Sequence, residues 1–319
     1  DTQDAFATEL LAACKEKNIP KVKELIKEHR LWVKPVVNQL ISDYIDRTMA
    51  GNKTAAASRK DAARLIAQTF QETYGERSLT IGLGYLDTWS LEELGKKAQA
   101  DRIYGIATDL RLKNQFEEAT EKYQQALKLY QEIEDVRGQG EVLGGLGYIY
   151  WFSDIETCLN YYHKALNLRV EVDDRVLIGA TLNSIGGTYL QYLQEPDSAK
   201  AYLKRATEVR EEIGDMAGLG SSMFNLARAY DELGELETAL HSYQKSFAIL
   251  QELGRLNRMA HSKLGSGTIL RQLGRYPEAL QDLETARDLF QELTDTTYLG
   301  DTYTQPVSYT HLTLPTITE

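Results

Sequence analysis

Residues 274–286 read Gly274-Arg-Tyr276-Pro-Glu-Ala279-Leu-Gln-Asp-Leu283-Glu-Thr-Ala286, and near-copies of this segment recur along the chain. Each copy places a small residue soon after a turn and ends on Tyr or Leu followed, three positions later, by another small residue. The first small residues stand 39, 41, 40 and 40 positions apart, at Ala119, Cys158, Ala199, Ala239 and Ala279. Such constant spacing indicates a repeat architecture.

A second pattern precedes each copy: a small residue with a large one three positions later, and hence on the same helix face. These pairs are Ala107/Leu110, Gly147/Tyr150, Gly186/Tyr189, Ala227/Tyr230 and Gly267/Leu270. Antiparallel helices approach closely only where one carries a small residue, so we predict two helices per repeat, packed at these positions. Cys158 is then interpreted as a buried substitute for alanine rather than a reactive thiol.

The two patterns together resemble the tetratricopeptide repeat, whose Leu-Gly-x-x-Tyr and Ala-x-x-x-Tyr/Phe-x-x-Ala motifs they follow. The usual period is about 34 residues. Longer units such as these are similar to those of kinesin light chains and of many bacterial scaffold and sensor proteins. The resemblance implies an all-α, right-handed superhelical solenoid of antiparallel helix pairs, in which the first helices line a concave groove.

The repeats divide the chain into four predicted parts. Residues 1–95 form an irregular helical N-terminal cap or degenerate repeats, with helices expected at Asp4–Lys17, Pro20–His29, Val33–Met49, Thr54–Tyr74 and from Ser90 onward. Residues 96–294 hold five repeats, joined by linkers in which Asp or Gly supplies a helix cap or a stop. A linker at Leu293–Asp295 opens a truncated sixth repeat over residues 295–305.

Residues 306–319 form the fourth part. The run Val307–Thr316 resembles the conceptual translation of a transposon-type adapter used in preparing sequencing libraries. We therefore expect the natural reading frame to end near Gln305, with a natural Thr-rich tail as the alternative. His311 receives no functional role in either case.

Composition excludes several classes of function. The chain has 319 residues, with 36 Lys+Arg against 47 Asp+Glu, and this net charge of −11 disfavours a nucleic-acid partner. Its apolar runs fall short of the roughly 20 residues that span a bilayer, so we predict no membrane partner. Two distant cysteines exclude a disulfide framework and favour a cytoplasmic location. The chain starts at Asp1 rather than Met, so export stays an alternative.

Neither a catalytic site nor a cofactor or metal site is predicted. The histidines His29, His163, His241 and His261 have no metal-ligand spacing and are expected on solvated helix faces. The glycine-rich stretch at 138–145 lacks the Gly-Lys-Ser/Thr ending of a phosphate loop. The region before the repeats gives the chain a resemblance to the N-terminal part of bacterial CHAT-family proteins, whose caspase-like catalytic His and Cys would lie beyond this chain.

The remaining candidate site is the concave groove. Its predicted binding residues point away from the packing face of the first helices: Tyr104, Thr108, Arg111, Tyr148, Trp151, Asn183, Gln191, Phe224, Asn225, Arg228, Asp231, Thr268 and Arg271. Asn183 and Asn225 resemble the asparagines that hydrogen-bond an extended peptide in relatives, since an amide both donates and accepts. Each of these residues taken alone is also compatible with ordinary solvated surface.

The sequence thus predicts a scaffold that binds a protein or peptide. One alternative is the regulatory or substrate-recruiting arm of a larger CHAT-type peptidase. Another is a sensor of short signalling peptides that becomes more compact when its ligand binds.

Overall fold

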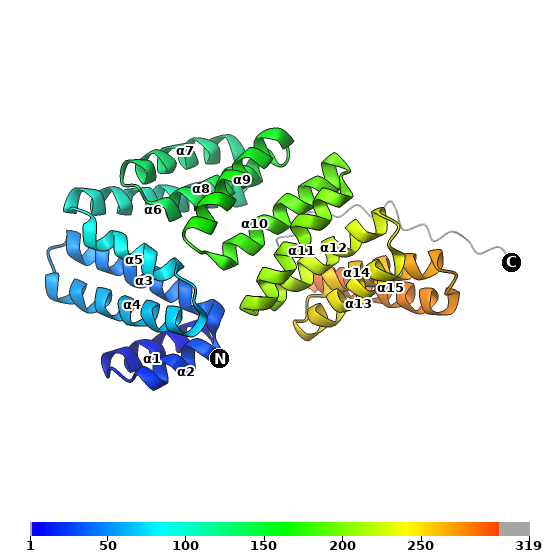
Figure 1. Ribbon diagram of the computed structural model, residues 1–319, viewed down its shortest axis with the longest axis horizontal. Coiled ribbons are helices and arrows are strands. Elements are labelled where there is room, and N and C mark those ends of the chain that lie inside the picture. Colours follow the sequence, from blue (N-terminus) through cyan, green and yellow to red (C-terminus); the bar gives the residue numbers. More distant parts are fainter. Residues whose placement is uncertain (1, 300–319) are drawn as a thin grey trace.

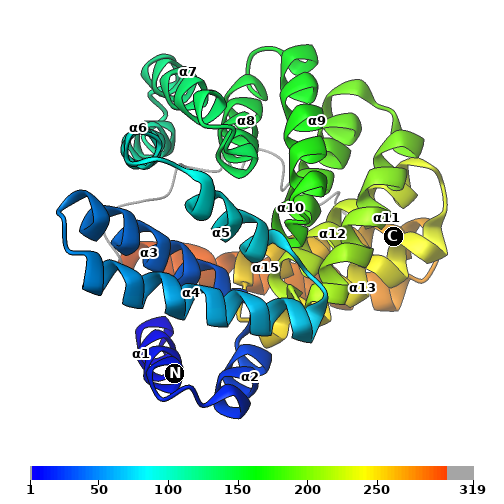
Figure 2. The same cartoon turned by 60° about the vertical axis from the view of Figure 1, so that its left-hand side comes forward.

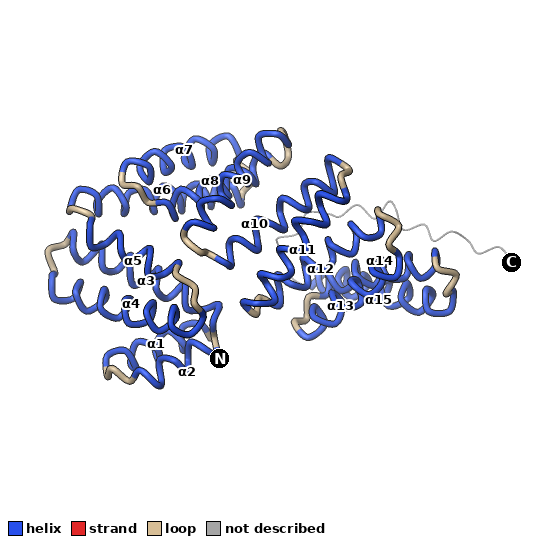
Figure 3. Tube along the Cα trace, in the orientation of Figure 1, coloured by secondary structure: helices blue, strands red, loops and turns tan. Residues whose placement is uncertain are grey.

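The computed structural model describes residues 2–299, and within this range the chain forms fifteen α-helices and one π-helical turn without a strand (Figure 3). The predicted all-α solenoid of antiparallel helix pairs is confirmed. Short loops join the helices throughout, and each helix packs mainly against its neighbours in sequence.

Five helices precede the regular helix pairs and lie at one end of the molecule in Figure 1, and we use the name cap for these five helices. They are α1 (Gln3–Lys15), α2 (Ile19–Glu28), α3 (Arg30–Met49), α4 (Lys53–Tyr74) and α5 (Ser78–Thr88). The sequence predicted the first four within a few residues and missed α5. Gly82 and Gly84 interrupt its apolar pattern, and glycine is a poor helix former.

Five helix pairs follow the cap. The first helices are α6 (Leu91–Leu112), α8 (Val136–Tyr150), α10 (Arg175–Thr188), α12 (Met216–Glu232) and α14 (Leu256–Gln272). Their partners are α7 (Phe116–Glu132), α9 (Ile155–Glu171), α11 (Pro196–Ile213), α13 (Leu236–Glu252) and α15 (Tyr276–Leu299).

Small residues set how closely the two helices of a pair approach. A Cβ atom added to Gly147 would lie 2.6 Å from the Tyr162 ring, and one added to Gly186 would lie 2.6 Å from Leu203 Cγ. Both distances are shorter than any carbon contact, so these positions of α8 and α10 require glycine. Cys158 is fully buried on α9, as the pattern predicts, and burial raises the pKa of its thiol to about 11.

Aspartates in the linkers cap three of the first helices, as the sequence predicts. The side chains of Asp135, Asp174 and Asp215 cap α8, α10 and α12 by accepting a hydrogen bond from a backbone N–H three residues on. The residue before each capping aspartate has a positive φ, which Gly214 adopts without strain.

Two places differ from the simple repeat. The extra residue of the third repeat is absorbed by a π-helical turn, Tyr189–Leu193, directly before α11. At the other end, α15 continues through Asp295 to Leu299, where the sequence predicted a linker. Residues 300–319 lie outside the described part of the chain, so the truncated sixth repeat and the non-native tail stay predictions.

An ionic cluster joins the cap to the repeats: the buried carboxylates of Glu76 and Asp174 pair with the partly buried Arg30 and Lys34. Lys34 Nζ lies 2.6 Å from Glu76 Oε1 and 2.7 Å from Asp174 Oδ1. Arg30 pairs with Glu76 and donates to the backbone carbonyl of Glu212 at 3.2 Å. The cap therefore lies beside the linkers that follow α9 and α11, as Figures 1 and 2 show from two directions.

Candidate functional site

The first helices carry the candidate site. Contacts join α6 to α8, α10 to α12, and α12 to α14, and these contacts are more extensive than any between successive second helices. The stack therefore curves towards its first helices. We call the surface on which these helices face away from their partners the first-helix face; Asn183 and Asn225, two of the predicted binding residues, belong to it. Between α8 and α10 the contact is made through the buried guanidinium of Arg169, a residue of α9. This guanidinium lies against Gly144 of α8 and donates to Thr181 of α10.

The predicted residues nearest the cap are held by a buried tyrosine. Thr108 Oγ1 lies 3.2 Å from the Tyr123 hydroxyl, and Arg111 Nε donates to the same oxygen at 3.3 Å. Tyr104 packs against the Tyr123 ring, and burial raises the pKa of Tyr104 to about 12. The guanidinium of Arg111 lies 4.7 Å from the centre of the Tyr148 ring, a cation–π contact that joins α6 to α8.

Tyr148 and Trp151 belong to a larger group of aromatic rings at the end of α8. Phe152 lies at its centre, with ring centroids 4.9 Å from Trp151, 5.5 Å from Tyr148 and 5.6 Å from Phe116. Trp151 also contacts Tyr192 of the π-helical turn, at 5.1 Å. We call these five residues the aromatic cluster. Phe152 is 53% exposed, although rings that pack so well usually avoid water.

A pair of asparagines lies on α10 and α12. Asn225 Nδ2 donates to Asn183 Oδ1 at 3.1 Å, and Ser222 Oγ donates to the same oxygen at 3.1 Å. Ser222 in turn accepts from the buried Arg210 at 2.6 Å. This network occupies Asn183 Oδ1 and Asn225 Nδ2, so the amide nitrogen of Asn183 can still donate and the amide oxygen of Asn225 can still accept.

The remaining predicted residues are more scattered. Phe224 packs between Tyr243 and His261, with ring centroids 5.7 and 6.4 Å away. Arg228 and Asp231 are half-buried one turn apart on α12, and Arg271 is exposed near the end of α14. Thr268 turns its hydroxyl back to the carbonyl of Leu264 and so offers no free donor. Gln191 is exposed on the π-helical turn. In the regular register of the repeats, the equivalent groove position is occupied by Leu190, which is buried.

The residues predicted from the sequence include both asparagines and two rings of the aromatic cluster, but not Phe116, Phe152 or Tyr192. These three lie in or beside the turns between paired helices, outside the first-helix positions from which the groove residues were predicted. The histidines are less solvated than expected: His29 stacks on Trp32 with ring centroids 4.3 Å apart, and among the four only His241 is exposed.

Along residues 2–299, no three His, Cys, Asp or Glu side chains gather as metal ligands would. Nor is any of the helices described long and apolar enough to cross a membrane.

Residues 187–252, from the end of α10 to the end of α13, match the tetratricopeptide repeat family. The fold is a tetratricopeptide repeat solenoid. A search of the curated proteins finds no match.

Solved structures share this tetratricopeptide fold. The apo form of RapI has a TM-score of 0.56 at 16% identity, over 94% of this chain and 79% of that one. Aspartyl phosphate phosphatase F from Bacillus subtilis has a TM-score of 0.55 at 12% identity, over 82% and 76%. BtubC from P. vanneervenii has a TM-score of 0.54 at 18% identity, over 82% and 94%. At these identities the likeness is one of fold.

Proposed function

We propose that the chain is a scaffold that binds an extended peptide segment of a partner protein along its first-helix face. The observation that carries the proposal is the asparagine pair. An extended peptide offers alternating N–H and C=O groups, and the free donor of Asn183 and free acceptor of Asn225 match one such unit. Neither amide must give up its existing hydrogen bonds to bind it.

The network beneath the pair favours binding for an energetic reason. Arg210 and Ser222 hold the Asn183 carbonyl oxygen, so little side-chain freedom remains to be lost when a peptide arrives. Each amide hydrogen bond contributes about 0.5–1.5 kcal/mol net, which gives orientation more than affinity.

The aromatic cluster supplies the affinity that the asparagines lack. Exposed rings in contact are typical of binding hot spots, and Tyr and Trp dominate such spots because they bury large areas with few rotatable bonds. Tyr148, Phe152 and Tyr192 are each at least 39% exposed. We therefore expect the bound segment to carry at least one large apolar side chain near this cluster.

A library of random peptides displayed on phage, selected against the full chain, tests this function. The affinity of the strongest binder is then measured by isothermal titration calorimetry. Combining Asn183→Ala with Asn225→Ala should weaken binding about tenfold or more, and Phe152→Ala should weaken it by a similar factor. The matched control combines Asn160→Ala with Asn167→Ala, two exposed asparagines of α9, and should leave the affinity unchanged.

The proposal is wrong if selection yields no binder, or if every binder responds to the α9 control and none to the α10 and α12 pair. The recruiting-arm and peptide-sensor alternatives use the same face. A downstream His/Cys peptidase domain in the full-length gene would favour the first, and a more compact chain on peptide binding would favour the second.

A further inference from the structure

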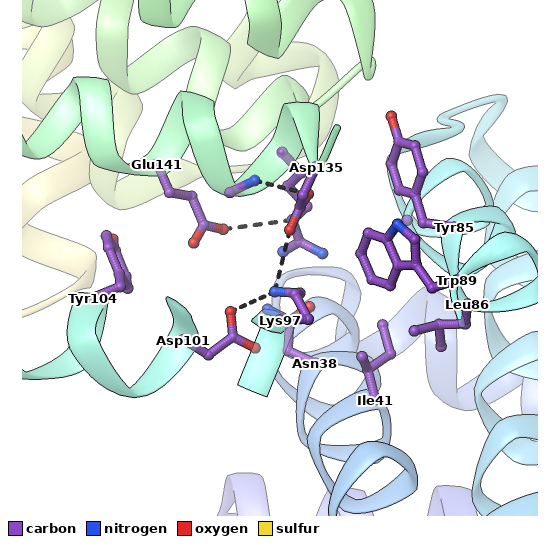
Figure 4. A pocket seen from close by; sticks show the side chains of 13 residues that line it. Asn38, Ile41, Tyr85, Leu86, Trp89, Lys97, Asp101, Tyr104, Asp135 and Glu141 are labelled. Carbon is purple, nitrogen blue, oxygen red and sulfur yellow. Dashed lines mark hydrogen bonds and ion pairs between the residues drawn. The ribbon is translucent and has the colours of Figure 1, made fainter. Parts of the chain in front are cut away.

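A cavity of about 190 Å³ lies where the cap meets the first two repeats, between α3 and α5 on one side and α6 and α8 on the other (Figure 4). One wall is apolar and comes from Ile41, Leu86 and the Trp89 ring. The opposite wall is charged and comes from α6 and α8. A cavity of about 150 Å³ holds benzene, so this one has room for a small molecule but not for a nucleotide-sized cofactor.

Most of the charges in the cavity satisfy one another. Lys97 Nζ lies 2.5 Å from Asp101 Oδ1 and 3.3 Å from Asp135 Oδ2. Asp101 also accepts from the Tyr130 hydroxyl at 2.7 Å, and Asp135 caps α8 through the N–H of Gly138 at 3.0 Å. These three groups need no further partner.

Arg137 and Glu141 differ from the other charged groups. They form an ion pair one turn apart on α8, but Arg137 Nε lies 3.5 Å from Glu141 Oε1, which is too long for a good hydrogen bond. Arg137 Nε is buried without a hydrogen-bond partner. A buried donor left in this state costs about 1–3 kcal/mol, and Arg169 Nε and Arg210 Nε are in the same state. Arg137 differs from these two because it lines the cavity together with Glu141.

We propose that the cavity binds a free α-amino acid with an apolar side chain, its carboxylate paired with Arg137 and its ammonium with Glu141. The inference is independent of the peptide-binding function. An α-amino acid carries both charges on one carbon, which matches two opposite charges one helical turn apart. Its side chain would then lie against Trp89, whose indole nitrogen is already bonded to the Ile133 carbonyl at 3.0 Å.

Other ligand classes fit less well. A simple anion would face three carboxylates, and a simple cation would face Arg137 and Lys97. The end of a peptide chain carries only one of the two charges. A bound amino acid would touch both α5 and α8, so its binding energy would hold the cap against the repeats.

Isothermal titration calorimetry of the full chain with each standard amino acid tests the proposal. At least one apolar amino acid should bind, and for leucine the analogues without the amino group (isocaproate) or without the carboxyl group (isoamylamine) should bind more weakly. Arg137→Gln should weaken binding about ten- to a hundredfold, the loss expected for a charged hydrogen bond. Arg102→Gln, an exposed arginine of α6, should have no effect.

A second variant separates binding from folding. Gly82 faces Arg137 across the cavity, and a Cβ atom there would lie 3.9 Å from Arg137 Nη1, an ordinary contact. Gly82→Leu should fill the cavity and abolish binding with every charge in place, whereas Gly82→Ala should retain it. Circular dichroism confirms that both variants fold. A cavity that holds only water would bind none of the amino acids, and that result, or binding unaffected by Gly82→Leu, would overturn the proposal.

Discussion

Gly186 and Gly187 are neighbours on α10, and the same substitution should have opposite effects at the two positions. A methyl group at Gly186 would lie 2.6 Å from Leu203 Cγ and 3.2 Å from the backbone oxygen of Ala199. At Gly187 nothing lies within 4 Å of the added atom. Leu203 is fully buried, so it has no free space into which to move.

The magnitude follows from two terms. Replacing glycine by alanine inside a helix stabilises the fold by about 0.5–1 kcal/mol at either position. Overpacking a well-filled core costs about 1–3 kcal/mol, and only Gly186→Ala incurs this cost. Gly187→Ala should therefore stabilise the chain, and Gly186→Ala should be less stable than Gly187→Ala by about 1–3 kcal/mol, because the helical term cancels.

Urea denaturation of both variants, followed by far-UV circular dichroism, measures this difference. The two variants share one background, one helix and one chemical change, so unfolded-state effects also cancel to first order. Equal unfolding midpoints, or a more stable Gly186→Ala, would refute the packing argument for the glycines of the first helices.

Two further predictions concern charge and thiol chemistry. Burial by itself would raise the pKa of Asp174, but the charges of Lys34 and Arg137 outweigh it and hold that pKa below its usual value. Asp174→Asn keeps the helix cap and removes the charge, and it should cost about 3 kcal/mol near neutral pH. Since the stability gained from a lowered carboxyl pKa is lost as pH falls through it, the difference in urea midpoint from the wild type should shrink below about pH 4; a constant difference would contradict this. Burial raises the pKa of both Cys14 and Cys158 to about 11. A thiol reagent at pH about 8 should therefore label both cysteines slowly in the native chain and rapidly in urea. Rapid labelling of Cys158 in the native chain would show that α9 is not packed as described.

The repeat itself could be predicted because its determinants are local. Small residues at a constant spacing define the crossing of each helix pair, and an aspartate before a helix caps it by contacts within three residues. The missed helix α5 and the one-residue shift at Gln191 have local causes as well: glycines obscure one, and a π-helical turn produces the other.

The rest could not be predicted because it depends on contacts between distant segments. Lys34 meets Asp174 across 140 positions. The cavity forms where α5 of the cap lies opposite Arg137 of α8, and these two segments are far apart in the sequence. Neither relation leaves a periodic signal in the sequence. The asparagine pair was recognised by resemblance, but the network through Ser222 and Arg210 that orients it required the structure.

A crystal structure of the full chain with a selected peptide tests most directly whether the first-helix face binds an extended peptide. We predict a peptide backbone whose carbonyl accepts from Asn183 Nδ2 and whose N–H donates to Asn225 Oδ1, with an apolar side chain against the aromatic cluster. A peptide bound along the second helices, or one that leaves both asparagines untouched, would contradict the account.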